Sequence, residues 1–137
     1  MGSECHPRPS SRDDFKIAII CALPLETNPV IASLDEVWHD ANYGQVPGDE
    51  NSYNFGWSGG HAVVIATSPG IGDRYISTMC SAMKLSFISI ELALFVGICG
   101  AVPFKHDDRI AEIILGDIVM SDDATQYLGD IGQVTWP

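Results

Sequence analysis

The chain has 137 residues, of which 46% are apolar and 18% charged, so it is long enough to form one folded domain and is not a disordered polypeptide. Its 18 acidic side chains outnumber 7 basic ones and give a formal charge of −11. This balance argues against a nucleic acid polymer or an anionic membrane surface as the main partner, because both bind clustered Lys and Arg.

Two features place the chain in the cytoplasm. The apolar stretch 92–104 is too short to span a bilayer and contains glycines and a proline. The polar segment 1–13 lacks the apolar core of a secretory signal, and we expect it to be a flexible leader. We therefore predict a cytoplasmic protein without a membrane partner.

The cysteines and histidines do not form a recognisable metal motif. Cys5, Cys21, Cys80 and Cys99 have no CxxC spacing, and the four histidines have no HExxH spacing. Cys21 and Cys99 lie inside apolar runs, so we interpret them as reduced core thiols rather than as disulfide or zinc ligands. We expect no metal and no cofactor.

The first half of the predicted domain begins with a strand. Residues 15–22 are apolar and rich in isoleucine, which is typical of a strand buried on both faces. Pro24 ends this run, and Asn28 followed by Pro29 resembles an N-cap and first helical residue, which predicts a helix from Pro29 to about Trp38. Residues 40–50 are rich in turn formers and predict an exposed loop.

A hairpin and a second helix follow. Residues 51–57 and 62–68 flank the sequence Ser58-Gly59-Gly60-His61, which is a hairpin signal. Apolar residues then recur at helical spacing and predict one buried face on a helix over 73–86. These residues are Ile76, Met79, Cys80, Met83 and Phe87.

The remaining elements complete an alternating order. Residues 92–97 predict another buried strand, 103–109 a polar loop, and 113–121 a last strand. The alternation of strands and helices predicts an α/β fold with a central mixed sheet.

Candidate chemistry lies where three predicted strands end, because ligands in α/β sheets bind beyond the carboxyl ends of strands. These ends are 22–26, 68–72 and 97–100, and their small residues allow a ligand to approach the backbone. The turn with Gly70 and Gly72 could hold an anion on free N–H groups, or be a plain turn. Glu26 could orient or deprotonate a water, although the residues alone favour a glutamate that stabilises a helix N-terminus.

Five motifs in order resemble the purine and uridine nucleoside phosphorylase superfamily, in its nucleosidase-like branch and in the fungal form that accompanies NACHT and ankyrin domains. They are spread over residues 14–128, which leaves 129–137 as a divergent tail. The motifs are DFKIAIICALPLE at 14–26, PGDENSYNFG at 47–56, PGIG at 69–72, LALFVGICGAVPF at 92–104 and LGDIVMSD at 115–122.

The resemblance implies a three-layer α/β/α fold around a mixed sheet, and cleavage of the N-glycosidic bond of a purine nucleoside or nucleotide. The expected partner is therefore a small molecule, and a homo-oligomer is also possible. The resemblance further implies that phosphorylases carry arginines at the positions of Glu26 and Phe95 and a serine or threonine at that of Ile98. A carboxylate and two apolar residues cannot hold phosphate, so these residues favour water as the nucleophile.

The site that the resemblance implies has one catalytic residue, Glu26, which would orient the hydrolytic water. Gly70 and Gly72 would bring the backbone close to the sugar. The other substrate-binding residues that we predict are Ala22, Leu23, Gly97, Ile98, Cys99 and Gly100.

In the family, the purine-binding residues and the catalytic aspartate lie in the second half of the domain, beyond the position of Pro137. We therefore expect this chain to be incomplete as a catalyst, with weak or no activity. A non-catalytic remnant or interaction fragment is the alternative, and a genuine phosphorylase is a second one. A sheet that ends midway also predicts an uncovered strand edge and an aggregation-prone chain.

Overall fold

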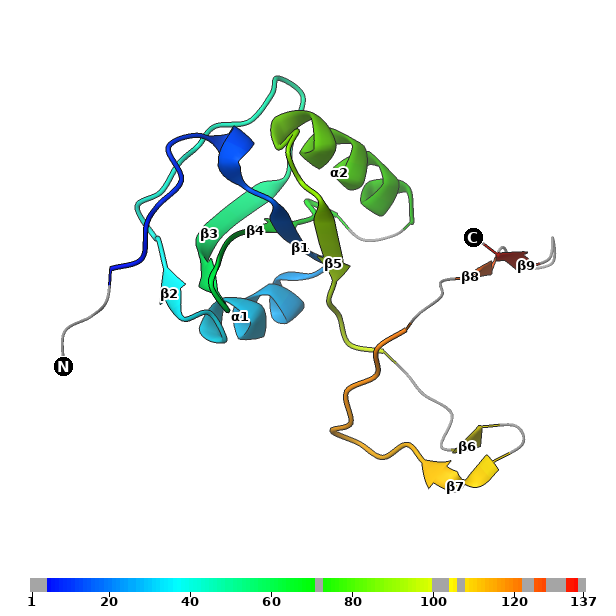
Figure 1. The fold of residues 1–137 in the computed structure, drawn as a ribbon. Helices are drawn as coiled ribbons and strands as arrows, with labels where there is room; N and C mark the ends of the chain where they lie inside the picture. Colours follow the sequence, from blue (N-terminus) through cyan, green and yellow to red (C-terminus); the bar gives the residue numbers. More distant parts are fainter. Residues whose placement is uncertain are drawn as a thin grey trace. The chain divides into compact units, whose positions relative to one another are not determined.

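The computed structural model describes residues 5–70, 73–99, 104–105, 108–121, 125–127 and 133–135, and the chain divides into two units, Met1–Ile98 and Cys99–Pro137. The first unit contains a five-stranded sheet in the order β2-β3-β4-β1-β5 (Figure 1). Its strands are β1 (Ile17–Cys21), β2 (Glu36–Val37), β3 (Ser52–Ser58), β4 (His61–Thr67) and β5 (Leu92–Phe95). Strand β1 pairs in parallel with β4 and β5, whereas β3 is antiparallel to β2 and β4, so the sheet is mixed as expected.

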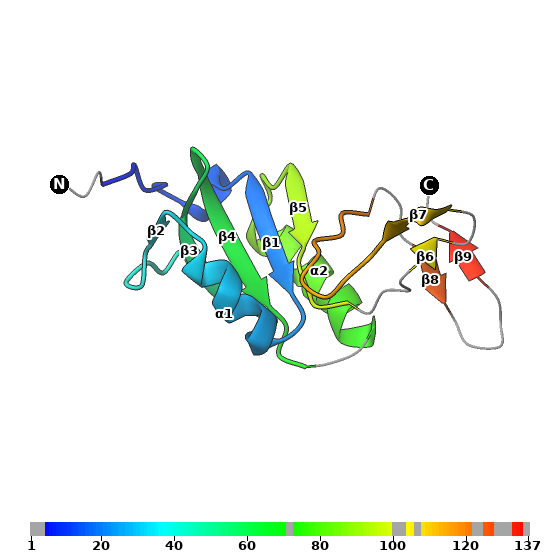
Figure 2. The same ribbon diagram turned by 90° about the horizontal axis from the view of Figure 1, so that it is seen from below.

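Two helices cover the two faces of this sheet. Helix α1 (Pro24–Ala32) lies on one face and α2 (Asp73–Ser86) on the other, with the strands between them (Figure 2). Met79 and Met83 of α2 pack with Ala18 and Ile20 of β1 in one buried cluster. The predicted three-layer α/β/α fold is confirmed.

The first helix begins earlier than the sequence analysis predicts. Pro24, which was expected only to end the strand, is the first residue of α1, where its restricted φ suits the helix and its missing N–H costs nothing. Pro29, the expected start, lies inside the helix. The predicted extension to Trp38 is also wrong, because Glu36 and Val37 pair with β3 instead.

The hairpin and the second helix are confirmed. Ser58 pairs with His61 across the turn, and Gly59 and Gly60 both have positive φ values, 56° and 89°, which favour glycine at each position. Helix α2 has the predicted bounds, and its Met79 and Met83 are buried.

The loop 40–50 is irregular, as predicted, but one of its carboxylates is buried. Asp49 is 8% exposed and accepts hydrogen bonds from Tyr53 Oη at 2.6 Å and Ser86 Oγ at 2.5 Å. Asn51 donates to Tyr53 Oη and to the carbonyl oxygen of Met79. These bonds tie the loop to β3 and α2, so the loop is part of the folded unit.

Residues before the first strand contact the same unit. The ring of His6 stacks on Trp57 at 5.0 Å between ring centroids, and Arg8 Nη1 lies 3.0 Å from Asp40 Oδ1. Ser11 caps a short 3-10 helix, Arg12–Asp14. The expected leader thus has defined contacts over the part that the structure describes.

The second unit contains two small antiparallel sheets, β6 (Phe104–Lys105) with β7 (Asp108–Glu112), and β8 (Thr125–Tyr127) with β9 (Gln133–Thr135). The predicted loop 103–109 therefore overlaps two strands. The predicted strand 113–121 is wrong: Asp117 closes a turn on Ile114 through its backbone N–H at 3.1 Å, and Gly116 has a φ of 100°. The turn preference of Gly116 and Asp117 outweighs the apolar pattern around them.

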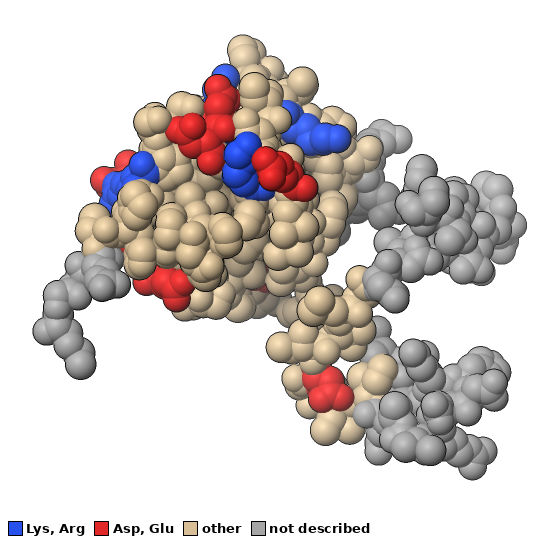
Figure 3. All heavy atoms as spheres, in the orientation of Figure 1, with Lys and Arg blue, Asp and Glu red and all other residues tan. Residues whose placement is uncertain are grey.

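Figure 3 shows one face of the molecule with its charged side chains coloured. Among the described residues on that face, basic side chains lie beside acidic ones rather than gathering together (Figure 3). Lys16 Nζ, for example, lies 2.9 Å from Glu91 Oε1. Within the described part of the chain, no helix is both long and apolar enough to cross a membrane.

Candidate functional site

Glu26 closes the turn that joins β1 to α1. It occupies the third position of the helix, and its Oε2 accepts hydrogen bonds from the backbone N–H groups of Ala22 and Leu23, both at 3.1 Å. This is the carboxylate half of a capping box, which satisfies N–H groups that have no partner within the helix. The helix-stabilising role that composition favoured is therefore present.

The other oxygen of Glu26 reaches the end of a different strand. Its Oε1 accepts a hydrogen bond at 3.1 Å from the N–H of Ile98, which lies 72 residues further along the chain. Gly97 allows this approach, because a Cβ there would lie 2.9 Å from Oε1 and 3.3 Å from Cδ. We call this group, Ala22, Leu23, Glu26, Gly97 and Ile98, the carboxylate clasp.

The clasp leaves Glu26 capacity for one more partner. A carboxylate has about four acceptor sites, and among the described residues three backbone donors, Ala22, Leu23 and Ile98, use three of them. Glu26 is also only partly buried. The remaining site can accept a hydrogen bond from one water molecule or one ligand hydroxyl.

A buried polar pair lies beside the clasp. Thr27 Oγ1 is 2.8 Å from Thr67 Oγ1, and the two residues are 4% and 7% exposed. Cys21 is fully buried next to them; burial raises the pKa of its thiol, and the charge of Glu26 adds to this, while a hydrogen bond with Thr27 opposes it. The thiol is therefore protonated at neutral pH and is a poor nucleophile.

The second predicted turn lies at the end of β4. Ser68 Oγ donates to the carbonyl oxygen of Gly70 at 2.7 Å, and the ring of Tyr75 covers Gly70 so closely that a Cβ would lie 2.8 Å from it. Gly72 and Gly100 lie outside the described residues, and Cys99 belongs to the second unit. Cys99 is exposed, which corrects its interpretation as a core thiol.

Of the predicted site residues, the structure thus joins five into the clasp. It places Gly70 on the neighbouring strand end, since Ser68 N donates to the Cys21 carbonyl oxygen at 3.3 Å. The sequence analysis missed Thr27 and Thr67. Their only signal is position, because each is a hydroxyl residue in or next to an apolar element end.

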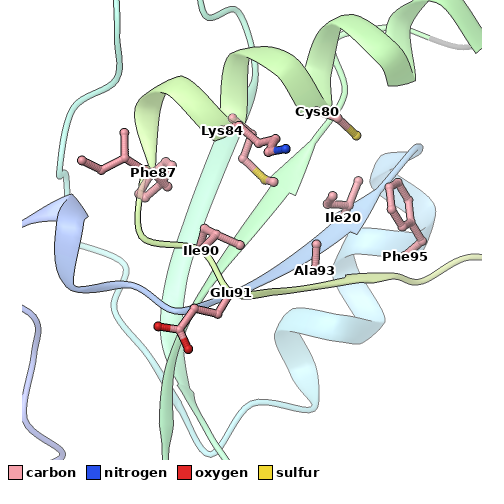
Figure 4. Close-up of a pocket in the computed structure, with 10 residues that line it drawn as sticks. Ile20, Cys80, Lys84, Phe87, Ile90, Glu91, Ala93 and Phe95 are labelled. Atoms are coloured by element: carbon pink, nitrogen blue, oxygen red, sulfur yellow. The ribbon is translucent and has the colours of Figure 1, made fainter.

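An apolar hollow of about 360 Å³ lies on the face that α2 covers (Figure 4). Cys80 and Lys84 of α2 line one side, and Ile20, Ala93 and Phe95 of the strands line the other. Strand β5 is the last strand of the described sheet, and its Phe95 is 64% exposed.

The chemistry of the clasp follows from its donors and charges. Phe95 and Ile98, 64% and 75% exposed, offer no side-chain hydrogen-bond donor or positive charge for phosphate. The carboxylate of Glu26 would repel that anion. Among the described residues, no group of three or more His, Cys, Asp or Glu side chains is placed to hold a metal ion. The clasp can orient a neutral, proton-donating molecule.

The fold and the clasp define an α/β domain with a carboxylate at the carboxyl edge of its sheet, the edge where ligands bind in folds of this class. Comparison with known families is more specific: the model of the phosphorylase superfamily matches residues 16–135, so the chain belongs to that superfamily.

A curated relative indicates a larger setting for such a domain. The chain is 35% identical over 125 residues to a nucleotide-binding leucine-rich repeat (NLR)-like protein of Hyaloscypha variabilis. The match covers 90% of this chain but only 12% of that protein. No solved structure matches the chain significantly.

Proposed function

We propose that this domain cleaves the N-glycosidic bond of a purine nucleoside or nucleotide with water as the nucleophile. In this reaction the C1′–N9 bond breaks, the water oxygen bonds to C1′, and the base leaves with a proton. The observation that carries the proposal is the carboxylate clasp, which holds Glu26 at the sheet edge with one acceptor site left for water.

Negative charge suits this chemistry for a second reason. Cleavage passes through a sugar with oxocarbenium character, and a nearby carboxylate stabilises that developing positive charge. Phe95 and Ile98 support water over phosphate because neither side chain can bind an anion. A cytoplasmic location and a small-molecule partner are parts of the same proposal.

The principal alternative is a non-catalytic module inside a larger protein. The matched relative supports this alternative. Its name describes a nucleotide-binding leucine-rich repeat-like protein, and the matched region is 12% of its length. A domain of this kind could bind a nucleoside or nucleotide without cleaving it.

Adenosine cleavage under single-turnover conditions separates these functions, since excess protein makes weak activity visible. We expect adenine and free ribose to appear at a rate independent of phosphate. Glu26→Gln should slow this step roughly 100-fold, the size typical of losing a group that handles the attacking water. Thermal unfolding of both proteins controls for a folding defect.

Each competing result has a definite meaning. Ribose 1-phosphate, formed only when phosphate is present, would assign a phosphorylase. Unchanged adenine release in Glu26→Gln would remove Glu26 from the reaction. Adenosine binding without adenine release would favour the non-catalytic module.

A further inference from the structure

The two threonines beside the clasp are part of one hydrogen-bond chain. Thr27 Oγ1 donates to the Leu23 carbonyl oxygen at 3.1 Å. It also shares a 2.8 Å hydrogen bond with Thr67 Oγ1, in which either hydroxyl can be the donor. These contacts link Thr67 through Thr27 to Leu23.

This chain connects the two turns at the edge of the sheet. Thr27 follows Glu26 in the first turn of α1, and the Leu23 N–H is one of the donors to Glu26. Thr67 is the last residue of β4 and leads directly into Ser68, whose hydroxyl closes the turn on Gly70. A shift of either turn would stretch the contact between the two hydroxyls.

We propose that Thr27 and Thr67 are positioning residues, which hold the Glu26 carboxylate in place relative to the turn that carries Gly70. The inference rests on the proposed function, in which a water molecule must lie between Glu26 and the sugar. Orientation of this kind requires a placement accurate to about 0.5 Å. A buried hydroxyl pair restricts the first turn of α1 more than apolar packing does, because a hydrogen bond is directional.

Thr67→Val is the informative substitution, because Thr67 does not contact Glu26 and its loss leaves the helix sequence unchanged. Valine has a similar shape and lacks the hydroxyl, whereas Thr67→Ser keeps the hydroxyl and is the matched control. Hydrogen exchange of the full chain would be measured at the amides of Leu23 and Ile98, which Glu26 holds, and at the amide of Val64 inside the sheet.

We expect exchange of the Leu23 and Ile98 amides to rise roughly fivefold more than exchange of Val64 in Thr67→Val, the factor that corresponds to about 1 kcal/mol. Thr67→Ser should restore wild-type exchange. Equal acceleration at all three amides would show a loss of general stability only and would overturn the proposal, as would a serine variant that behaves like valine. If Thr67→Val does not fold, Thr27→Val reports on the same amides.

A kinetic measurement extends the test to the reaction. In the adenosine assay, Thr67→Val should lower the rate of the cleavage step with little change in the half-saturating concentration, and Thr67→Ser should recover the rate. If the wild-type chain releases no adenine, the proposed function fails while the exchange data still decide whether the threonines position Glu26.

Discussion

Gly97→Ala tests the carboxylate clasp because it keeps the charge of Glu26 but moves it. The added Cβ would lie 2.9 Å from Glu26 Oε1, whereas non-bonded heavy atoms pack at about 3.5 Å or more. The carboxylate must therefore move away from the new Cβ by roughly 0.6 Å to reach this contact distance. Its 3.1 Å hydrogen bond with the N–H of Ile98 would then be lost.

The free energy of this loss is small but measurable. Hydrogen bonds to charged groups contribute about 1.5–3 kcal/mol when buried, and the exposure of Ile98 reduces this to about 1 kcal/mol. Alanine also restricts the unfolded chain, which stabilises the protein by about 0.4–1 kcal/mol at a compatible position. Because the two effects nearly cancel, the melting temperature of Gly97→Ala alone is uninformative.

A double-mutant cycle with Glu26→Ala isolates the contact. In the Glu26→Ala background, the new Cβ meets no carboxylate, so Gly97→Ala should be neutral or stabilising. Urea unfolding of the four proteins should give a coupling free energy of about 1 kcal/mol between residues 26 and 97. A coupling below about 0.3 kcal/mol, within the usual error of additivity, would refute the clasp as a stabilising contact.

Three further outcomes follow from the buried polar groups and close contacts. Tyr53→Phe removes the hydrogen bond with Asp49 and should lower the free energy of unfolding by about 1–2 kcal/mol in a denaturant titration. Burial, and then the hydrogen bond with Asp49, raise the pKa of Tyr53 above its usual value of about 10. The stability that Tyr53 contributes is therefore complete below about pH 10 and is lost as the pH rises further. When unfolding is followed from pH 8 to 11, the decline above pH 10 should be smaller in Tyr53→Phe than in the wild type. Gly56→Ala should lower the free energy of unfolding by about 1–3 kcal/mol, because the added Cβ would collide with the carbonyl oxygen of Glu36 and lie 2.7 Å from Leu34 Cδ1. A thermal melt that matches the wild type would show that β2 moves away freely.

Elements with a local signal could be predicted from the sequence. The hairpin follows from Gly59 and Gly60 between two apolar runs, and α2 follows from apolar residues at helical spacing. The start of α1 could not be predicted in this way, because Pro24 and Pro29 both suit a first helical position. The capping contact of Glu26 decides between them, and it is visible only in three dimensions.

The candidate site likewise has a part with a local sequence signal and a part that depends on the three-dimensional fold. Sequence reasoning identified Glu26 and the strand ends around it, because these residues are consecutive or carry a motif. It could not show that the Glu26 carboxylate meets Ile98, since that contact depends on β1 and β5 ending at the same edge. The hydroxyl pair of Thr27 and Thr67 has only its position as a signal, and that signal is too weak to predict the contact because threonine at a strand end or in a helix is common.

The two interpretations of Glu26, as a helix cap and as the residue that orients water, are compatible in this structure. The cap uses Oε2, and the contact with Ile98 uses only part of the capacity of Oε1. A carboxylate that is held by three backbone donors cannot rotate freely, so its remaining acceptor site points in a defined direction. A free glutamate would have to lose side-chain entropy before it could orient a water, whereas here that cost is already met during folding. The structural role of Glu26 is therefore a precondition of its proposed catalytic role. Gly97→Ala moves the carboxylate but keeps its charge. If this variant loses cleavage with little loss of stability, the placement of the carboxylate matters to the reaction and its charge alone is not enough.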